Sequence, residues 1–305
     1  MKNSRKCIFK SIVCMLLSII IIGTSSIYSS AATTSYKKVS SITKVGSYYI
    51  WVDEYEGLYV MKSGSSKKLI VRQPYEYGTE ISVDLVTNGS KIYYSVITDK
   101  SDDKDYGKIY RIDVSGKNKK FISKVSHLSY LNGYYNNKLY ISIHDSDSYA
   151  SSYAGDESVY SCNVKTGKTS LIKRNCYVIS QSGKYLLLET IALDYEGMPI
   201  YCYNASTNKK YKITSEGGTA SFVNGKIYYS YIRDTYSKHK EVLKSCSYTG
   251  KNQKTIKTFN FENGGNISSI NKTNVEYAKY NRDHTKTTMY KYYYKTGKTV
   301  KIKQL

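Results

Sequence analysis

The sequence lacks the residue patterns that mark the commonest catalytic and metal sites. It contains no GxSxG nucleophile elbow, no HExxH zinc motif and no sialidase box. Its four histidines, His127, His144, His239 and His284, lie far apart in the sequence. These absences argue against the familiar hydrolase classes and leave only a dispersed active site open.

Cysteine is also scarce for a disulfide-rich scaffold. Six cysteines occur in 305 residues, and Cys7 and Cys14 belong to the N-terminal segment described below. The other four, Cys162, Cys176, Cys202 and Cys246, show no CxxC-type zinc spacing. A chain of this length can build its own core. We therefore expect Cys162, Cys202 and Cys246 to serve as small apolar side chains in strands.

Long apolar runs are missing beyond the N-terminus, and the single run there is short. Ile12 to Ile22 follows the basic residues Lys2, Arg5, Lys6 and Lys10, and the small residues Ser30, Ala31 and Ala32 come after it. A membrane span needs about 20 apolar residues. The pattern predicts a secretory signal peptide over residues 1–32, with an uncleaved anchor as the alternative. The protein is then secreted and extracellular, with no later membrane span.

Acidic residues are few relative to basic ones. There are 24 Asp and Glu against 46 Lys and Arg, which gives a formal net charge of +22. Most of the basic residues are lysines, which suit a solvated basic surface better than bidentate phosphate recognition. We expect no nucleic-acid partner, because a secreted chain rarely meets one and the tyrosines lie in strands rather than beside arginines.

What the sequence has in abundance is a repeat of short tyrosine-rich strands. Segments such as 91–94 and 226–229, both KIYY, recur six times at intervals of about 45 residues. Each is followed by a polar loop, a third strand and a tight turn, marked in order by Gly64, Gly116, Gly167, Asn208, Gly250 and Gly297. Asn208 preserves the turn, because asparagine tolerates a left-handed backbone better than other residues with a side chain.

This repeat predicts an all-β fold, a six-bladed β-propeller of four-stranded antiparallel blades preceded by the signal peptide. The strands are apolar on both faces, as expected for sheets covered on both sides. We expect one propeller domain over residues 33–305, with blades near 36–78, 79–125, 126–175, 176–217, 218–264 and 265–305. We also expect the ring to close by packing between its first and last blades, without an N-terminal strand in the last blade.

Residues 109–116, IYRIDVSG, resemble the third strand and turn of the YWTD propellers of the LDL-receptor class. Residues 49–53, YIWVD, are a looser echo of the YWTD strand itself. The lysine-rich blades resemble more closely a bacterial secreted family, domain-of-unknown-function 5050. The resemblance implies a six-bladed propeller and no particular activity.

Charges separate between the two ends of the expected blades. The loops between second and third strands hold most of the acidic residues, whereas the turns after the third strands are rich in lysine. A ring of one sign creates a field that attracts polyanions, although lysine in tight turns also serves solubility. The candidate binding residues are Lys117, Lys119, Lys120, Lys165, Lys168, Lys251, Lys254, Lys295 and Lys298.

Two of the polar loops suggest other sites. Asp99, Asp102, Asp103 and Asp105 could supply oxygen ligands to calcium, but they lack the EF-hand spacing, and a solvated loop is the alternative. No other cofactor is indicated. The loop from His144 to Glu157 is either mobile or a contact surface.

We expect a secreted, non-enzymatic binding or scaffold module, acting as a monomer. Its partner would be an anionic cell-envelope polymer or a surface protein. The alternative is a propeller-type lyase or lactonase that acts on a small extracellular substrate.

Overall fold

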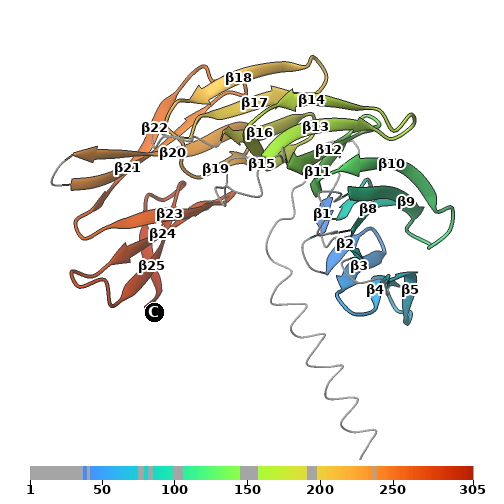
Figure 1. The fold of residues 1–305 in the computed structure, drawn as a ribbon. Coiled ribbons are helices and arrows are strands. Elements are labelled where there is room, and N and C mark those ends of the chain that lie inside the picture. Colours follow the sequence, from blue (N-terminus) through green and yellow to red (C-terminus); the bar gives the residue numbers. More distant parts are fainter. Residues whose placement is uncertain are drawn as a thin grey trace, which may run out of the picture. The chain divides into compact units, whose positions relative to one another are not determined.

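All regular structure in the described part of the chain is β-strand, as a computed structural model shows (Figure 1). The described residues are 37–39, 42–74, 79–81, 85–98, 106–144, 157–190, 198–235 and 238–304. The proposed signal peptide lies outside them. Within these ranges, no helix long and apolar enough to span a membrane occurs.

The strands form six antiparallel sheets that follow one another in chain order. The first sheet contains β2 (Thr43–Val45), β3 (Tyr48–Asp53), β4 (Gly57–Lys62) and β5 (Lys67–Arg72). The second contains β1 (Lys37–Val39), β6 (Thr79–Ile81), β7 (Leu85–Thr87), β8 (Lys91–Thr98), β9 (Tyr106–Asp113) and β10 (Lys120–Ser126). The third contains β11 (Leu128–Tyr135), β12 (Lys138–His144), β13 (Glu157–Asn163) and β14 (Thr169–Lys173).

The remaining three sheets repeat the same four-stranded order. The fourth contains β15 (Cys176–Ser182), β16 (Tyr185–Thr190), β17 (Ile200–Asn204) and β18 (Lys209–Thr214). The fifth contains β19 (Ala220–Val223), β20 (Lys226–Thr235), β21 (Lys238–Cys246) and β22 (Lys254–Phe261). The sixth contains β23 (Gly265–Ile270), β24 (Asn274–Tyr280), β25 (Thr287–Tyr293) and β26 (Thr299–Gln304).

The second sheet departs from the simple pattern at its first edge. Strands β6 and β7 both pair with β8, so they are successive pieces of one edge. Strand β1 pairs with β7, which makes it an additional strand of the second sheet. The described N-terminal strand therefore does not belong to the sixth sheet, in agreement with the expectation from the sequence.

Successive sheets pack face to face, and each junction has its own apolar core. In β8, Ile92 and Tyr94 pack toward the first sheet while Tyr93 packs toward the third. Full burial of one such side chain contributes about 1.5–3 kcal/mol. Covered faces on both sides explain why these strands read as unbroken apolar runs rather than alternating ones.

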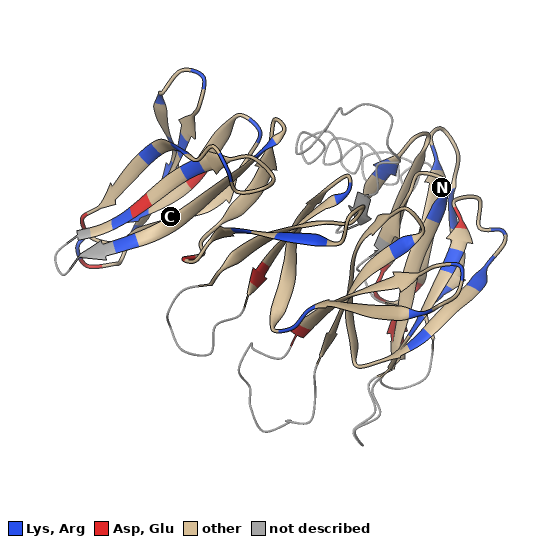
Figure 2. Ribbon diagram, turned by 90° about the horizontal axis from the view of Figure 1, so that it is seen from above, with Lys and Arg blue, Asp and Glu red and all other residues tan. Residues whose placement is uncertain are grey.

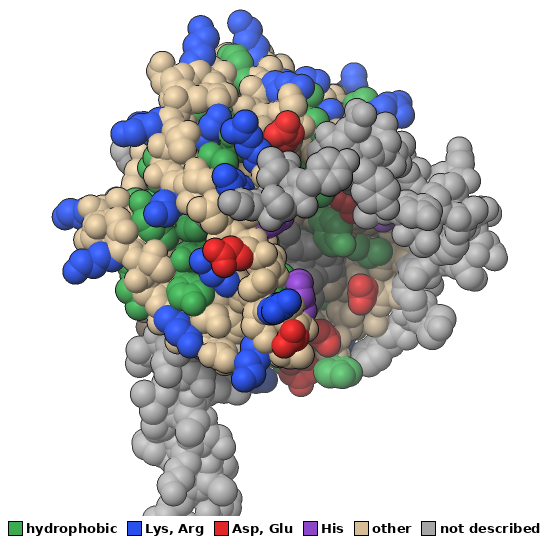
Figure 3. Space-filling model, turned by 90° about the vertical axis from the view of Figure 1, so that its left-hand side faces the viewer, with side chains coloured by type: hydrophobic (Ala, Val, Ile, Leu, Met, Phe, Trp, Pro, Cys, Tyr) green, Lys and Arg blue, Asp and Glu red, His purple; other side chains and the backbone are tan. Residues whose placement is uncertain are grey.

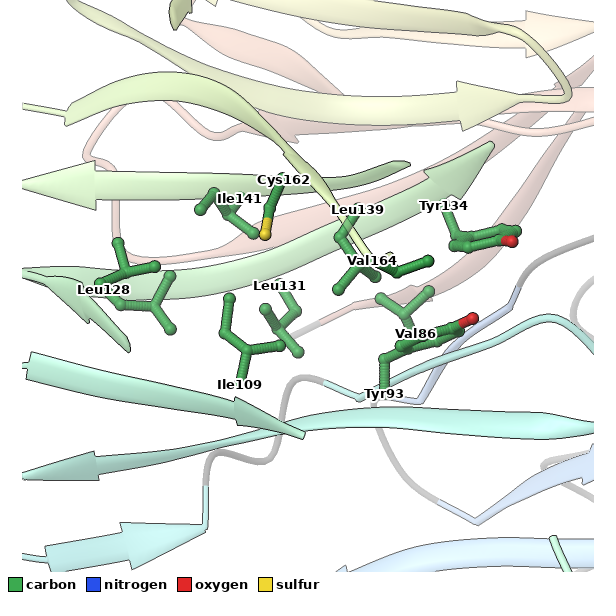
Figure 4. Close-up of a cluster of buried hydrophobic side chains, with 11 residues drawn as sticks. Val86, Tyr93, Ile109, Leu128, Leu131, Tyr134, Leu139, Ile141, Cys162 and Val164 are labelled. Carbon is green, nitrogen blue, oxygen red and sulfur yellow. The ribbon is translucent and has the colours of Figure 1, made fainter. Parts of the chain in front are cut away.

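Figure 4 shows the core between the second and third sheets. Val86, Tyr93 and Ile109 from the second sheet meet Leu131 and Leu139 from the third. The rings of Tyr93 and Tyr134 stack across the junction, with centroids 5.1 Å apart. Aromatic pairs of this kind add to the stability that area burial provides.

Five such cores join the six sheets in chain order. This succession of antiparallel meanders, each packed on the next, is the architecture of a six-bladed β-propeller, as the sequence predicts. None of these clusters, drawn from the described residues, joins the first sheet to the sixth. Closure of the ring by packing between those two sheets therefore stays a prediction.

The tyrosines fill the space between sheets, but not all their hydroxyl groups find polar partners. Tyr203 donates to Oδ1 of Asn208 at 2.7 Å, as expected for a buried tyrosine. Within the described residues, the hydroxyls of Tyr94 and Tyr140 are buried without a hydrogen-bond partner. Burial raises the pKa of both phenols, so they stay neutral.

The tight turns after the third strands use a left-handed residue at the marked position. Asn208 has a φ of 55°, which confirms that it replaces glycine in the turn of the fourth sheet. Gly64 and Gly167 occupy the same position in the first and third sheets, with φ values of 78° and 73°. Their surroundings differ, however. A Cβ added at Gly167 would lie 2.5 Å from the carbonyl oxygen of Ile122 in the second sheet, whereas nothing lies within 4 Å of one added at Gly64.

The variants Gly64→Ala and Gly167→Ala test this contact between neighbouring sheets. Both place a side chain at a positive φ, which costs about 1–2 kcal/mol. Gly167→Ala must also displace backbone of the second sheet, so we expect it to lower the free energy of unfolding by roughly a further 1–3 kcal/mol. Urea unfolding of both variants measures the difference. Equal losses would mean that the turn does not pack on the second sheet.

Candidate functional site

The nine candidate lysines all lie in or beside the turns after third strands. Lys117, Lys119 and Lys120 belong to the second sheet, Lys165 and Lys168 to the third, Lys251 and Lys254 to the fifth, and Lys295 and Lys298 to the sixth. All nine side chains are exposed. Because these turns connect equivalent strands of successive antiparallel sheets, they emerge at the same end of each sheet.

Hydrogen bonds inside each turn fix the backbone that carries these lysines. The amide of Gly116 donates to the carbonyl oxygen of Asp113 at 2.8 Å, and that of Gly167 donates to the carbonyl oxygen of Asn163 at 2.7 Å. The side chain of Asn163 also accepts from the amide of Lys165 at 2.9 Å. Such side-chain turns set the backbone and leave the lysine side chains in water.

The positive charge of the turns is little compensated. In the described part of the chain, salt bridges involve Lys67, Lys91 and Lys291, which are not among the nine lysines. Asp113 is the carboxylate closest in sequence to the turn of the second sheet. It already accepts from Nδ2 of Asn118 at 2.7 Å and lies 3.7 Å from Nζ of Lys91. Within the described residues, none of the nine turn lysines therefore has an acidic partner.

One face of the molecule shows the general excess of basic over acidic side chains. Lysine and arginine side chains project along much of its outline, and the acidic side chains in view are fewer (Figure 3). A field of one sign at a surface raises the local concentration of anionic partners.

Further lysines, not among the nine candidates, lie on the outermost strands, including Lys124, Lys212, Lys257, Lys301 and Lys303. All five side chains are exposed. The signal was present in the sequence, because the fourth strand of every repeat contains lysine and no acidic residue.

The predicted calcium ligands Asp99, Asp102, Asp103 and Asp105 lie outside the described residues, as do residues 145–156 of the His144–Glu157 loop. Within the described ranges, no group of three or more His, Cys, Asp or Glu residues is arranged to hold a metal ion. The calcium site stays a prediction.

All four cysteines of the propeller are buried and free. Burial raises the pKa of the Cys162, Cys176 and Cys246 thiols to about 11 and that of Cys202 to about 12. Such thiols are poor nucleophiles and poor metal ligands at neutral pH. The expectation of apolar packing is confirmed for Cys162, Cys202 and Cys246, which belong to the inter-sheet cores.

The histidines do not form a site together. His127 occupies the turn between β10 and β11, with a φ of 51°. His144 ends β12, His239 lies in β21, and His284 lies between β24 and β25.

Two buried carboxyl groups were not anticipated from the sequence. Glu241 is 2% exposed and accepts from the amide of Ile267 in the sixth sheet at 2.6 Å. Burial raises its pKa, although Ser230, the Ile267 amide and His239 oppose the rise. The strand register of β23 shifts after Ile267, and the Glu241 carboxyl accepts the hydrogen bond from the Ile267 amide at this irregularity. This contact joins the fifth and sixth sheets.

Glu189 is the second buried carboxyl, and it lies on β16 opposite Tyr177 of β15. Tyr177 donates a hydrogen bond to Oε2 of Glu189. Burial raises the pKa of Glu189, and the hydrogen bond from Tyr177 opposes the rise. In the equivalent position the second, third and fifth sheets carry the buried serines Ser95, Ser142 and Ser230. That replacement is visible in the sequence only once the register is known.

No protein-family model matches the chain, and no curated protein matches it. Among solved structures, an acylaminoacyl peptidase of Pyrococcus horikoshii is 14% identical over 86% of this chain and 44% of its own, with a TM-score of 0.51. An oligogalacturonate lyase of Vibrio parahaemolyticus is 11% identical over 88% of this chain and 79% of its own, with a TM-score of 0.50.

The β-propeller domain of the Trilobed protease of Pyrococcus furiosus is 10% identical over 75% of this chain and 72% of its own, with a TM-score of 0.49. The chain spans about half the length of the peptidases it matches, 50% of a prolyl endopeptidase and 44% of the acylaminoacyl peptidase. At these identities the likenesses bear on the fold alone.

The variant Glu189→Gln tests the buried carboxyl through the pH dependence of stability. The folded-state pKa is raised, so the stability that the protonated group contributes at low pH is lost as the pH rises through that pKa. We expect the melting temperature of the unmodified protein to fall as the pH rises above about 4–5, the usual range of a glutamate carboxyl, and to fall less in Glu189→Gln by at least roughly 2 °C.

The exposed residue Glu54 provides the control. Glu54→Gln should leave the pH dependence of the melting temperature unchanged. A Glu189→Gln profile parallel to that of the unmodified protein would contradict the raised pKa.

Proposed function

We propose that this protein is a secreted binding module that holds an anionic polymer of the cell envelope through its lysine-rich turns. The observation that carries the proposal is the set of nine exposed turn lysines at one end of the sheets, none of them in a salt bridge within the described part of the chain. A surface protein with an acidic face is the alternative partner.

The physical basis is additive electrostatics rather than a shaped pocket. A lysine ammonium group is a strongly hydrated point charge on a flexible stem, so it recognises charge more than geometry. One exposed lysine contributes little, but several at one surface produce a field that reaches about 10 Å at 0.1 M salt. Teichoic-acid-like polymers, with a charge in every repeat unit, are the ligand class that such a surface suits.

The proposal also covers the protein's family, its oligomeric state and its location. We propose that the chain is a divergent relative of the domain-of-unknown-function 5050 family, with a distant YWTD-like relationship, because segments such as residues 109–116 resemble both. The protein would act as a bacterial extracellular monomer that needs no cofactor.

A second candidate function rests on Glu189. Its buried carboxyl, its raised pKa and the hydrogen bond from Tyr177 are features of general acid–base groups. They favour a lyase or lactonase as the alternative activity. If an activity is found, its loss in Glu189→Gln without loss of stability would support this candidate.

The secretion part of the proposal has a direct test. If residues 1–32 are a signal peptide, the protein recovered from the culture medium should begin at Thr33 by N-terminal sequencing. Retention of Met1 on a membrane-bound protein would instead show an uncleaved anchor.

Charge reversal tests the turn lysines themselves. The triple variant Lys117→Glu, Lys119→Glu and Lys120→Glu should bind isolated cell envelopes at least roughly tenfold more weakly, because it replaces attraction by repulsion. Its stability should change little, since surface substitutions usually cost under about 0.5 kcal/mol each. Co-sedimentation with envelopes, together with urea unfolding, measures both effects.

The matched control reverses three exposed residues at the opposite end of a sheet, Lys279 near the end of β24 and Arg282 and Lys286 in the loop that follows. This control should bind nearly as well as the unmodified protein. Binding that does not weaken between roughly 0.1 M and 1 M salt, where the screening length falls from about 10 Å to about 3 Å, would contradict an electrostatic mechanism.

A further inference from the structure

The outermost strand of every sheet carries lysine and no acidic residue. These strands are β5, β10, β14, β18, β22 and β26, and their lysines are Lys67, Lys68, Lys120, Lys124, Lys173, Lys209, Lys210, Lys212, Lys254, Lys257, Lys301 and Lys303. All are exposed except Lys173, which is half-buried. Other strands do contain acidic residues, for example Asp113, Glu189 and Glu276. Figure 2 shows lysine and arginine on strands and turns of successive sheets.

These strands form the outer edge because the first strands contact one another. Strand β7 contacts β11, β15 contacts β19, and β19 contacts β23. The last strand of the second to sixth sheets therefore lies on the side away from these contacts, and β5 is the corresponding edge of the first sheet. Lysine on an edge strand prevents unwanted pairing with other chains. Edge protection does not explain the absence of Asp and Glu, since a charge of either sign interrupts an edge.

The basic elements of the first three sheets adjoin one another. A Cβ added at Gly116, in the turn of the second sheet, would lie 2.6 Å from Cγ2 of Ile70 and 3.7 Å from Nζ of Lys68, both on β5. At the next junction, Oγ of Ser123 on β10 donates to the carbonyl oxygen of Gly167 at 2.9 Å. Each turn thus lies against the outermost strand of the preceding sheet.

The same contact continues through the remaining sheets. Nζ of Lys210 on β18 donates to the carbonyl oxygen of Ile172 on β14 at 2.9 Å. A Cβ added at Gly250 would lie 2.7 Å from the carbonyl oxygen of Lys212 on β18. Nζ of Lys257 on β22 lies 5.5 Å from the ring centre of Tyr292 on β25. Basic elements of neighbouring sheets therefore meet at the first four junctions, and at the fifth a lysine of the outermost strand reaches the third strand of the next sheet.

We infer that the outer-strand lysines and the turn lysines form one continuous lysine strip, which binds a single long anionic polymer across several sheets at once. This inference rests on the proposed function and specifies its ligand as a long linear polyanion rather than a short one. The strip is defined by the lysines of the six outermost strands together with the nine turn lysines.

Length matters because of the spacing of the sheets. Packed sheets lie about 10 Å apart, so a chain that contacts all six must extend on the order of 50 Å. Once one segment is bound, further contacts form within the same complex and strengthen binding without requiring any single strong site. A short oligomer reaches only one or two sheets, so it gains little additional affinity from further contacts within the same complex.

The experiment uses purified full-length protein and inorganic polyphosphate, either as tripolyphosphate or as long chains. The distributed variant carries Lys68→Gln, Lys212→Gln and Lys303→Gln, which lie on the first, fourth and sixth sheets. The clustered variant carries Lys117→Gln, Lys119→Gln and Lys120→Gln on the second sheet alone. The control carries Lys279→Gln, Arg282→Gln and Lys286→Gln, outside the strip. All three variants remove the same charge.

Long polyphosphate should bind the unmodified protein at least roughly a hundredfold more tightly than tripolyphosphate does. The distributed variant should lose roughly tenfold or more in affinity for long chains, as the clustered variant does. Its slope of log affinity against log salt should fall by about 2–3, since each lysine that contacts a phosphate contributes about 1 to the slope. The control should keep the slope of the unmodified protein.

Two results would overturn the inference in different ways. If only the clustered variant loses affinity and slope, binding is local to one turn; the strip is wrong, and the proposed function stands. If the unmodified protein binds neither polyphosphate nor isolated envelopes at low salt, both the strip and the proposed function are wrong. Circular dichroism spectra of the three variants show whether each retains the fold.

Discussion

Burial of the inner sheets on both faces is the constraint from which the rest of the structure follows. Each of the five inter-sheet cores draws residues from two sheets, so the second to fifth sheets contribute to two cores each. Both faces of a strand such as β8 must then be apolar, and tyrosine meets this need with a large ring. The fully buried Tyr94 and Tyr140 show that packing has taken precedence over hydrogen bonding of every hydroxyl.

Burial of the faces restricts where charge can lie. A sheet covered on both sides is most exposed at its outermost strand, its turns and its loops. The excess of lysine is found there, and the carboxyl groups that do enter the interior each have a partner. Glu241 accepts from the amide of Ile267, and Glu189 accepts from Tyr177. The basic surface is therefore a geometric consequence of the fold combined with a composition rich in lysine.

The sequence predicts the repeat well, because its signals are local. Turn chemistry identifies Asn208 as the equivalent of a glycine, and its φ of 55° agrees. Features that depend on contacts between distant segments are not readable in this way. The pairing of β1 with β7 and the partnership of Tyr177 with Glu189 both depend on the register of strands in the folded chain.

The candidate site likewise combines features that the sequence predicts with features that only the folded structure shows. The turn lysines are found from the sequence because each follows a recognisable turn. Lys124 and Lys212 lie in the fourth strands of their repeats, and the order of strands within the sheets confirms that both occupy outermost strands. Gly116 lies close to Lys68 of the preceding sheet, which brings the turn of one sheet beside the outermost strand of another. This contact depends on the packing of the sheets and is not readable in the sequence.

The lysine strip also links binding to stability. Like charges on adjoining edges repel one another, and this repulsion opposes the compact state. Salt screens the repulsion without specificity, whereas a bound polyanion cancels it where the lysines are densest. An anionic polymer that binds the folded chain better than the unfolded one stabilises the fold by mass action. Under the proposed function, a surface that is unfavourable in isolation becomes favourable once its anionic ligand is bound.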